Sequence, residues 1–171
     1  MNAEELSRRL LDVWNARDMD GFIALLNENV RWYDCGMPQP PCIGRAAVRA
    51  FAESVIAAFP DFTYQIREPV CVSGDGTRCV FAWQITATAS GWMRPPGFAP
   101  TGRRVSFLGV DVLDAKDGRI VSIETYFDAA AAAEQLAGMR LRPKPGSFQE
   151  KILVWLQRAR AAWLRRRTSS V

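Results

Sequence analysis

The chain has 171 residues, of which 49 % are hydrophobic and 23 % charged, a composition typical of one globular domain with a substantial core. It contains no histidine, which excludes histidine-dependent triads, histidine-ligated zinc and histidine general bases. Acid–base chemistry near neutral pH must therefore use Asp, Glu, Tyr, Lys or Cys side chains.

The net charge of +4 is unevenly distributed along the chain. Residues 1–141 carry 14 basic and 17 acidic side chains, a net charge of −3, whereas residues 142–171 carry eight basic side chains and one acidic one, a net charge of +7. The mildly acidic body gives no reason to expect nucleic-acid binding. We therefore expect a folded domain over residues 1–141, followed by a linker and a basic helix over residues 142–171.

The N-terminus is polar and acidic and no apolar run is long enough to cross a bilayer, so we expect a cytoplasmic protein. The four cysteines show no metal-type spacing, and in that compartment we expect reduced thiols. A disulfide between Cys71 and Cys79, which flank a predicted turn, is the alternative. We expect neither a bound metal nor a cofactor.

Helical patterns fill most of the first 60 residues. Asn2 and Glu5 have the spacing of a capping box, and Asp18 is placed to cap a second, short helix. A third helix is predicted from Gly44 to the residue before Pro60, which ends it. The apolar residues of the first helix recur at helical spacing: Leu6, Leu10, Val13 and Trp14.

Strand patterns follow, except for one short strand over residues 30–34 that precedes the third helix. The loop over residues 35–43 is too rich in proline for a central strand. Two longer strands are predicted over residues 62–73 and 78–90, joined by a glycine-rich turn. The next loop, residues 91–102, is long and apolar, which is typical of a lid or binding loop.

Residues 101–128 predict a β-hairpin around a Lys116-Asp117-Gly118 turn. Asp111 lies inside its first strand, among apolar neighbours, and Asp128 lies at the end of its second strand. A carboxylate facing a core is costly unless it is paired, protonated or in use, so these two side chains indicate a pocket. Asp128 is also well placed to cap an alanine-rich helix that runs to about Ala137.

Helices followed by a run of antiparallel strands predict an α+β fold, in which a curved antiparallel sheet packs against the N-terminal helices. Such a sheet would leave a pocket at its open end. We expect an extra C-terminal helix outside this arrangement.

Several segments of residues 4–141 resemble the nuclear-transport-factor-2-like superfamily and its SnoaL-like polyketide cyclase branch. The segments that carry the resemblance are Trp14-Asn15-Ala16-Arg17-Asp18, Val30-Arg31-Trp32-Tyr33-Asp34, Thr101-Gly102-Arg103-Arg104-Val105-Ser106-Phe107, Gly109-Val110-Asp111-Val112, Asp117-Gly118-Arg119-Ile120-Val121 and Phe127-Asp128. The resemblance implies a cone-shaped fold and a homodimer. This fold hosts isomerases, cyclases, hydratases, epoxide hydrolases and non-catalytic binders.

The resemblance also implies roles for three carboxylates. Asp34 falls where the similar ketosteroid isomerases carry their proton-shuttling aspartate, and Asp111 falls close to their protonated aspartic acid. Asp128 matches an aspartate that often closes the last strand in the SnoaL-like branch. The oxyanion tyrosine of the isomerases would fall at Leu10, and a histidine found in many cyclase-like members would fall at Ile123.

Eight aromatic side chains are candidates to line a pocket for a flat, apolar substrate, although ordinary core packing would also explain each of them. They are Trp14, Trp32, Trp83, Trp92, Phe98, Phe107, Tyr126 and Phe127. Tyr33 and Tyr126 are candidate donors to an enolate, or amphipathic residues at a rim.

The leading hypothesis is a cofactor-independent acid–base enzyme that abstracts a proton next to a carbonyl in a polyketide-, steroid- or terpenoid-like substrate. Isomerisation or aldol-type cyclisation would follow, with Asp34 or Asp128 as base and protonated Asp111 as donor. One alternative is a binding protein without chemistry. Another is an epoxide hydrolase. The similar epoxide hydrolases carry an Arg and an Asp on the strand over residues 78–90, where this chain has Trp83, Gln84 and Ile85. Their remaining acidic residue would fall at Thr125.

The tail begins with Ser147 and Glu150 at capping-box spacing, and apolar residues then recur at helical spacing. These are Phe148, Ile152, Trp155, Leu156, Ala159 and Trp163. Such a basic helix fits either an anionic membrane surface or a groove on its own domain or on a second protomer. From the sequence we favour the protein groove.

Overall fold

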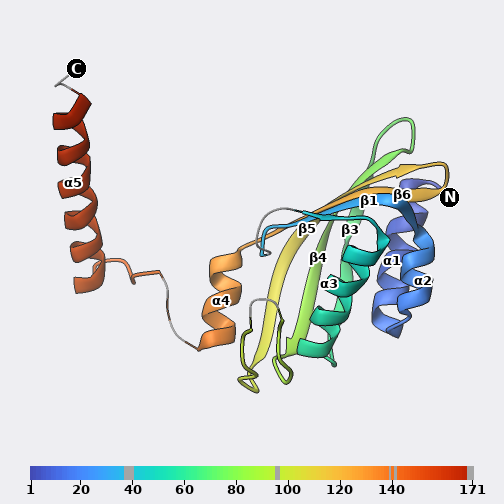
Figure 1. The fold of residues 1–171 in the computed structure, drawn as a ribbon, viewed down its shortest axis with the longest axis horizontal. Helices are drawn as coiled ribbons and strands as arrows, with labels where there is room; N and C mark the ends of the chain where they lie inside the picture. The colour runs from blue at the N-terminus through green and yellow to red at the C-terminus, as the bar shows by residue number, and fades with distance from the viewer. Residues whose placement is uncertain (37–40, 95–96, 139, 141, 169–171) are drawn as a thin grey trace. The chain divides into compact units, whose positions relative to one another are not determined.

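The first part of the chain folds with helices first and long strands after them, as the sequence predicts (Figure 1). The structure is a computed structural model that describes residues 1–36, 41–94, 97–138, 140 and 142–168. Its elements are, in chain order, α1 (Ala3–Ala16), α2 (Met19–Leu25), β1 (Leu26–Asp34), β2 (Cys42–Ile43), α3 (Arg45–Ala58), β3 (Thr63–Val72), β4 (Arg78–Thr88), β5 (Arg104–Lys116), β6 (Arg119–Phe127), α4 (Ala129–Ala137) and α5 (Phe148–Thr168).

Side chains fix the starts of the first two helices as expected. The Asn2 side chain accepts a hydrogen bond from the Glu5 backbone N–H at 2.9 Å, and the Glu5 carboxylate accepts one from the Asn2 N–H at 3.1 Å. This completes the predicted capping box of α1. Asp18 caps α2 by accepting from the Gly21 N–H at 2.8 Å. The helices therefore begin where the sequence places them.

Six strands form one sheet in the order β2-β1-β6-β5-β4-β3. Neighbouring strands are antiparallel except β1 and β6, which run parallel. These two strands lie far apart in sequence and are not joined by a hairpin, so no turn dictates their direction. At the β5–β6 turn, Asp117 and Gly118 have φ angles of 52° and 70°, which suit the tight turn predicted there.

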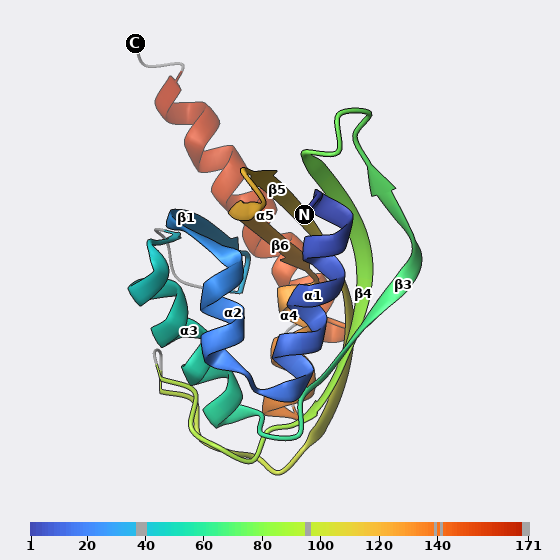
Figure 2. The same ribbon diagram turned by 90° about the vertical axis from the view of Figure 1, so that its right-hand side faces the viewer.

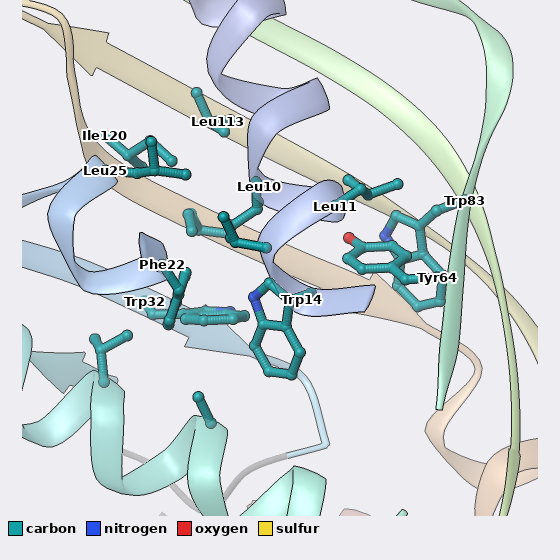
Figure 3. Packing of buried hydrophobic residues seen from close by; sticks show 14 of the residues in the cluster. Leu10, Leu11, Trp14, Phe22, Leu25, Trp32, Tyr64, Trp83, Leu113 and Ile120 are labelled. Carbon is teal, nitrogen blue, oxygen red and sulfur yellow. The ribbon is translucent and has the colours of Figure 1, made fainter. Parts of the chain in front are cut away.

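Helices α1, α2 and α3 cover one face of the curved sheet, and the core lies between them and the strands (Figure 1, Figure 2). Trp14 and Trp32 meet edge to face in this core, with ring centroids 5.8 Å apart, and Phe22 contacts both rings (Figure 3). The expected α+β class with a curved sheet against N-terminal helices is confirmed.

The predicted strand over residues 30–34 is longer in the structure, because α2 passes directly into β1 at the fully buried Leu26. The loop predicted over residues 35–43 ends in the short strand β2, which pairs with Arg31 and Trp32. Residues 37–40 of that loop lie outside the described residues. All four cysteines are free thiols, and no disulfide joins Cys71 to Cys79.

The chain divides into two units, Met1–Gly138 and Met139–Val171. Gly138 ends α4 in a left-handed conformation with φ of 68°. In the second unit, the Glu150 N–H donates to the Ser147 hydroxyl at 3.2 Å at the start of α5. No helix in the described part of the chain is long and apolar enough to cross a membrane.

Candidate active site

Three polar side chains form a row across the inner face of the sheet. Asp34 on β1 pairs with Thr125 on β6, and Thr125 pairs with Asp111 on β5. Side chains of directly paired residues point to the same face of a sheet. Asp111 is 2 % exposed and Thr125 is 6 % exposed, whereas Asp34 is only partly buried. The row therefore runs from a fully buried carboxylate to one that solvent can reach.

The Asp111 carboxylate accepts hydrogen bonds from three side chains. The Tyr64 hydroxyl donates to its Oδ2, and the Trp83 indole N–H donates to its Oδ1 at 2.9 Å. Thr125 supplies the third bond from its hydroxyl, which itself accepts from the Trp32 indole N–H at 3.1 Å. Figure 3 shows the Tyr64 hydroxyl oxygen and the Trp83 nitrogen side by side. The buried carboxylate is thus fully satisfied.

Gly109 lets Trp83 reach this carboxylate. The two residues pair across β4 and β5, and Gly109 lies two positions before Asp111 on the same strand face. A Cβ atom at Gly109 would lie 2.2 Å from the Trp83 ring, well inside a van der Waals contact. The absent side chain leaves room for the indole to lie across β5 and donate to Asp111.

Tyr64, whose hydroxyl donates a hydrogen bond to Asp111, was not predicted from the sequence as a site residue. Its backbone is anchored by Asn15 of α1, whose side chain accepts from the Tyr64 N–H and donates to the Tyr64 carbonyl, both at 2.8 Å. The signal was present in strand alternation, because Phe62 and Tyr64 are two residues apart and both are buried. Pairing with Asp111, however, depends on the register of three strands.

Both inner carboxylates have raised pKa values. Burial raises the pKa of Asp111 to about 6, against the lowering effect of its three hydrogen bonds. Burial also raises the pKa of Asp34 to about 6; the nearby Asp111 charge adds to this, and the Gly36 N–H at 2.7 Å opposes it. Tyr64 has a pKa well above 10 because of burial and the Asp111 charge, so it stays protonated. Both carboxylates therefore titrate close to neutral pH.

Lowering the pH from 7 toward 4 is expected to stabilise the fold. Between pH 4 and 6 the folded state binds more protons than the unfolded chain, since Asp34 and Asp111 titrate near 6 when folded and near 4 when unfolded. The free energy of unfolding should rise by up to about 3 kcal/mol for each carboxyl group. Urea denaturation at pH 7, 6, 5 and 4 measures this.

A variant with asparagine at both positions provides the control, because its stability should change little over this pH range. A wild-type protein that loses stability steadily from pH 7 to pH 4 would contradict the raised pKa values. Below about pH 4 the trend should reverse, since the pKa values of Asp61 and Asp75 are lowered by hydrogen bonds in the folded state.

Asp128 lies apart from the inner-face row and caps α4. Its carboxylate accepts a hydrogen bond from the Ala131 N–H at 2.8 Å, and its side chain is exposed. The predicted cap is therefore present.

The structure gathers three of the eight candidate aromatic residues beside the carboxylates. Phe107 and Phe127 stack with ring centroids 5.4 Å apart, and both rings contact Trp83, at 6.3 and 6.2 Å. Phe107 and Phe127 are partly exposed, whereas Trp83 is 1 % exposed. These three rings form an apolar wall that solvent reaches at its Phe107–Phe127 side.

The other five candidates do not join this wall. Trp14 and Trp32 pack in the core beneath the helices, where the indole N–H of Trp32 holds Thr125. Trp92 and Phe98 are 51 % and 62 % exposed on the loop after β4. Tyr126 is also at the surface, packed against Tyr33 with ring centroids 5.6 Å apart. Tyr126 faces outward because its strand neighbours on either side face the core.

A polar depression on the surface lies near the opposite end of β1 from Asp34. It is lined by Asn27, Glu28, Asn29, Arg45 and Arg119. It contains none of the aromatic or carboxylate candidates and does not form the expected pocket. Among the described residues, no cluster of Asp, Glu and Cys side chains is arranged to hold a metal ion.

Comparison with solved structures places the fold. A protein of Jannaschia sp. CCS1 assigned as a SnoaL-like polyketide cyclase matches with a TM-score of 0.70 and 22 % identity, over 82 % of this chain and 93 % of its own. AclR of Streptomyces galilaeus, assigned as a hydroxylase, matches with a TM-score of 0.67 and 22 % identity, over 96 % of this chain and 95 % of its own. These identities show the fold alone.

A third similar structure contains a ligand. It is a Mycobacterium tuberculosis protein in complex with estradiol-17β-hemisuccinate, with a TM-score of 0.61 and 20 % identity, over 75 % of this chain and 95 % of its own. A search of curated protein sequences finds no match to this chain. The sequence profile of the SnoaL-like domain, by contrast, matches residues 7–123. This chain, whose sheet and helices are those of the nuclear-transport-factor-2-like fold, therefore belongs to the SnoaL-like domain family.

Proposed function

We propose that this protein is a cofactor-independent acid–base enzyme that abstracts a proton next to a carbonyl group in an apolar, ring-containing substrate. One observation carries the proposal: Asp34 and Asp111 lie in one row on the inner face, and both have a pKa of about 6. Catalytic acids and bases work best when their pKa lies near the working pH. Buried pairs of carboxyl groups with such values are concentrated at functional sites.

Asp34 is the better base of the two. It is only partly buried, so a substrate can approach it, and at pH 7 a carboxyl group with a pKa of about 6 is mostly ionised. The raised pKa makes its carboxylate a stronger proton acceptor than an ordinary aspartate. The Phe127 ring lies near the same position, since a Cβ atom added to Gly36, two residues after Asp34, would lie 2.7 Å from this ring and 3.2 Å from the Asp34 carboxylate.

Asp111 and Tyr64 together supply the acid. Because the Trp83 indole can only donate, a proton on Asp111 must sit on Oδ2, the oxygen that faces the Tyr64 hydroxyl. Tyr64 then accepts from Asp111 and turns its own proton toward a substrate oxygen. Tyr64 thus provides the donor that the sequence leaves missing at Leu10.

The proposed step conserves atoms and charge. The Asp34 carboxylate takes a proton from the carbon next to the carbonyl, and the electrons of the broken C–H bond form the C=C bond of an enolate. The negative oxygen accepts a hydrogen bond from the Tyr64 hydroxyl, whose own oxygen accepts one from protonated Asp111. Asp34 then returns the proton to another carbon, which isomerises the substrate, or to the alkoxide formed when the enolate carbon closes a ring.

The apolar wall of Trp83, Phe107 and Phe127 supports a flat, apolar substrate such as a polyketide, steroid or terpenoid. The assignment of one neighbouring structure as a polyketide cyclase and the steroid ester bound to another are consistent with this class. Stacking on aromatic rings suits polycyclic ligands, whose hydrophobic surface is large.

Proton exchange in heavy water tests the proposal with a β,γ-unsaturated 3-ketosteroid as the probe. We expect the protein to speed both deuterium uptake next to the carbonyl, followed by NMR, and formation of the conjugated ketone, followed by ultraviolet absorbance. The rate should peak near pH 6, where Asp34 ionised and Asp111 protonated coexist most often. A tightly bound probe that shows no exchange at any pH would contradict the proposal.

A binding protein without chemistry is the second candidate. The observation that favours it is the burial of Tyr64 and Asp111, which are 7 % and 2 % exposed and already bonded to each other. In that case the probe would bind and be recovered unchanged, and Asp34→Asn would leave both affinity and exchange as they are.

A further inference from the structure

Helix α5 displays large apolar side chains to solvent. Every residue from Lys151 to Arg160 is exposed. Five of its exposed large apolar side chains, with exposed fractions between 43 % and 77 %, are Phe148, Ile152, Trp155, Leu156 and Trp163. Apolar exposure on this scale marks a surface for binding a partner.

These five residues share one side of the helix. At 3.6 residues per turn, their positions fall within a sector of roughly 100°. Trp155 and Trp163 lie eight residues apart, close to two full turns, so both indoles lie within this sector. Indole rings combine an apolar body with a polar N–H, which suits the boundary between water and hydrocarbon.

Basic residues lie on both sides of this apolar sector, and Arg166, five turns after Phe148, falls within it at the C-terminal end of the helix. Lys151, Arg158 and Arg165 follow one another at seven-residue spacing along one border, and Arg160 lies on the other. Leu153 and Leu164 continue the apolar surface beyond Arg160. Long basic side chains at such borders can place their stems on apolar surface and their charges in the polar layer above it.

The tail also has the charge that an anionic surface would attract. Residues 142–171 carry a net charge of +7, and Glu150 is their single acidic residue. Its carboxylate accepts a hydrogen bond from the Gly146 N–H at 2.6 Å at the start of the helix. The remainder of the chain has a net charge of −3, so the attraction is confined to the tail.

We propose that α5 binds the surface of a lipid bilayer that contains anionic lipids, lying in the plane of the headgroups with its apolar sector buried. Both parts of the surface are then used: the five apolar residues enter the acyl boundary, and the flanking cations meet lipid phosphates and carboxylates. Nucleic acid would use only the charges and would leave the central tryptophans exposed. A protein groove, which the sequence alone favours, would use the apolar sector but would not need the cations beside it, whereas an anionic bilayer uses both. The helix would hold the SnoaL-like domain next to a membrane, where apolar substrates accumulate.

Flotation of the full chain with lipid vesicles tests this proposal. We expect the protein to float with vesicles of phosphatidylcholine and phosphatidylserine at 7:3, and to stay below vesicles of phosphatidylcholine alone. Replacing Lys151, Arg158 and Arg165 by glutamine should weaken the binding by roughly tenfold to a hundredfold, as should raising the salt concentration. Trp155→Glu should also abolish flotation, because it places a charge in the apolar sector.

Val72→Glu is the matched control for Trp155→Glu, because Val72 is an exposed apolar residue of β3 and lies outside the tail. It should float like the wild-type protein, and circular dichroism should show that each variant keeps its fold. Equal flotation with both vesicle types, or none with either, would overturn the proposal. So would light scattering that shows a dimer separated into monomers by Trp155→Glu without any vesicle binding, since a second copy would then cover the helix.

Discussion

Replacing Asp34 by asparagine is expected to lower turnover of a β,γ-unsaturated ketone by about 10²- to 10⁴-fold, the usual contribution of a positioned general base. Asparagine has nearly the same shape and its side-chain oxygen can still accept from the Gly36 N–H, so the fold should be kept. It cannot take a proton from carbon. Steady-state kinetics should therefore show a fall in kcat, while KM changes little.

Asp128→Asn is the matched control for this variant. Asn is as good a helix N-cap as Asp, so the start of α4 and the activity should both be preserved. The pair of variants also separates the two bases that the sequence left open. Full activity of Asp34→Asn together with a large loss for Asp128→Asn would assign the base to Asp128 and contradict the present account.

Asp111→Leu is expected to destabilise the fold by about 3 kcal/mol or more, because each buried donor left without an acceptor costs about 1–3 kcal/mol. The change removes both oxygens that accept from Tyr64 and Trp83, and the Thr125 hydroxyl loses its acceptor as well. The Trp83 indole N–H can only donate, so it would be left without an acceptor. The ring lies against Gly109, which keeps the indole in this place. Urea denaturation at pH 7 measures the loss.

Asp111→Asn should fold much better than the leucine variant. Its side-chain oxygen can accept from Trp83, and its amide can donate to the Tyr64 oxygen, so both bonds survive without a buried charge. Its kcat should nevertheless fall, because an amide is a weaker hydrogen-bond donor to Tyr64 than a protonated carboxyl group, so the Tyr64 hydroxyl stabilises the enolate less. Equal stability of Asp111→Leu and the wild-type protein would show that the hydrogen-bonded cluster does not hold the fold.

The fold could be predicted from the sequence because the helix caps, the turn residues and the order of helical and strand patterns all indicate the same fold. The capping box at Asn2, the cap at Asp18, the turn at Asp117-Gly118 and the order of helices and strands all match the structure. Asp111 was predicted as a site residue because burying a carboxylate among apolar strand residues is costly unless it is paired or protonated. Asp34 was found because alternation places it on the same face as the buried Trp32.

The partners of Asp111 were harder to predict because they come from three other strands. Tyr64 and Trp83 reach it across β3, β4 and β5, and this depends on the pairing register, which one sequence does not reveal. Thr125 was noted only as a departure from another enzyme class, whereas in the structure it is the strand partner of both Asp34 and Asp111. Alternation still predicts correctly which strand residues face the core.

Aromatic character alone does not predict where a side chain lies in the fold. Trp92 and Phe98 lie in a loop with no strand alternation to orient them, and they are more than half exposed. Trp83, Phe107 and Phe127 are on paired strands, where neighbouring rings are brought together by the sheet. Position in the sheet, rather than aromatic character, separates the wall beside the carboxylates from the surface residues.

NMR titration of protein labelled with ¹³C at the aspartate carboxyl carbons tests directly whether Asp34 and Asp111 form a pair of carboxyl groups that titrate near neutral pH. The two asparagine variants assign the signals. We expect two carboxyl signals that titrate with apparent pKa values near 6 and that each shift when the other residue is replaced. Signals for both residues that titrate near 4, as in an ordinary exposed aspartate, would contradict it.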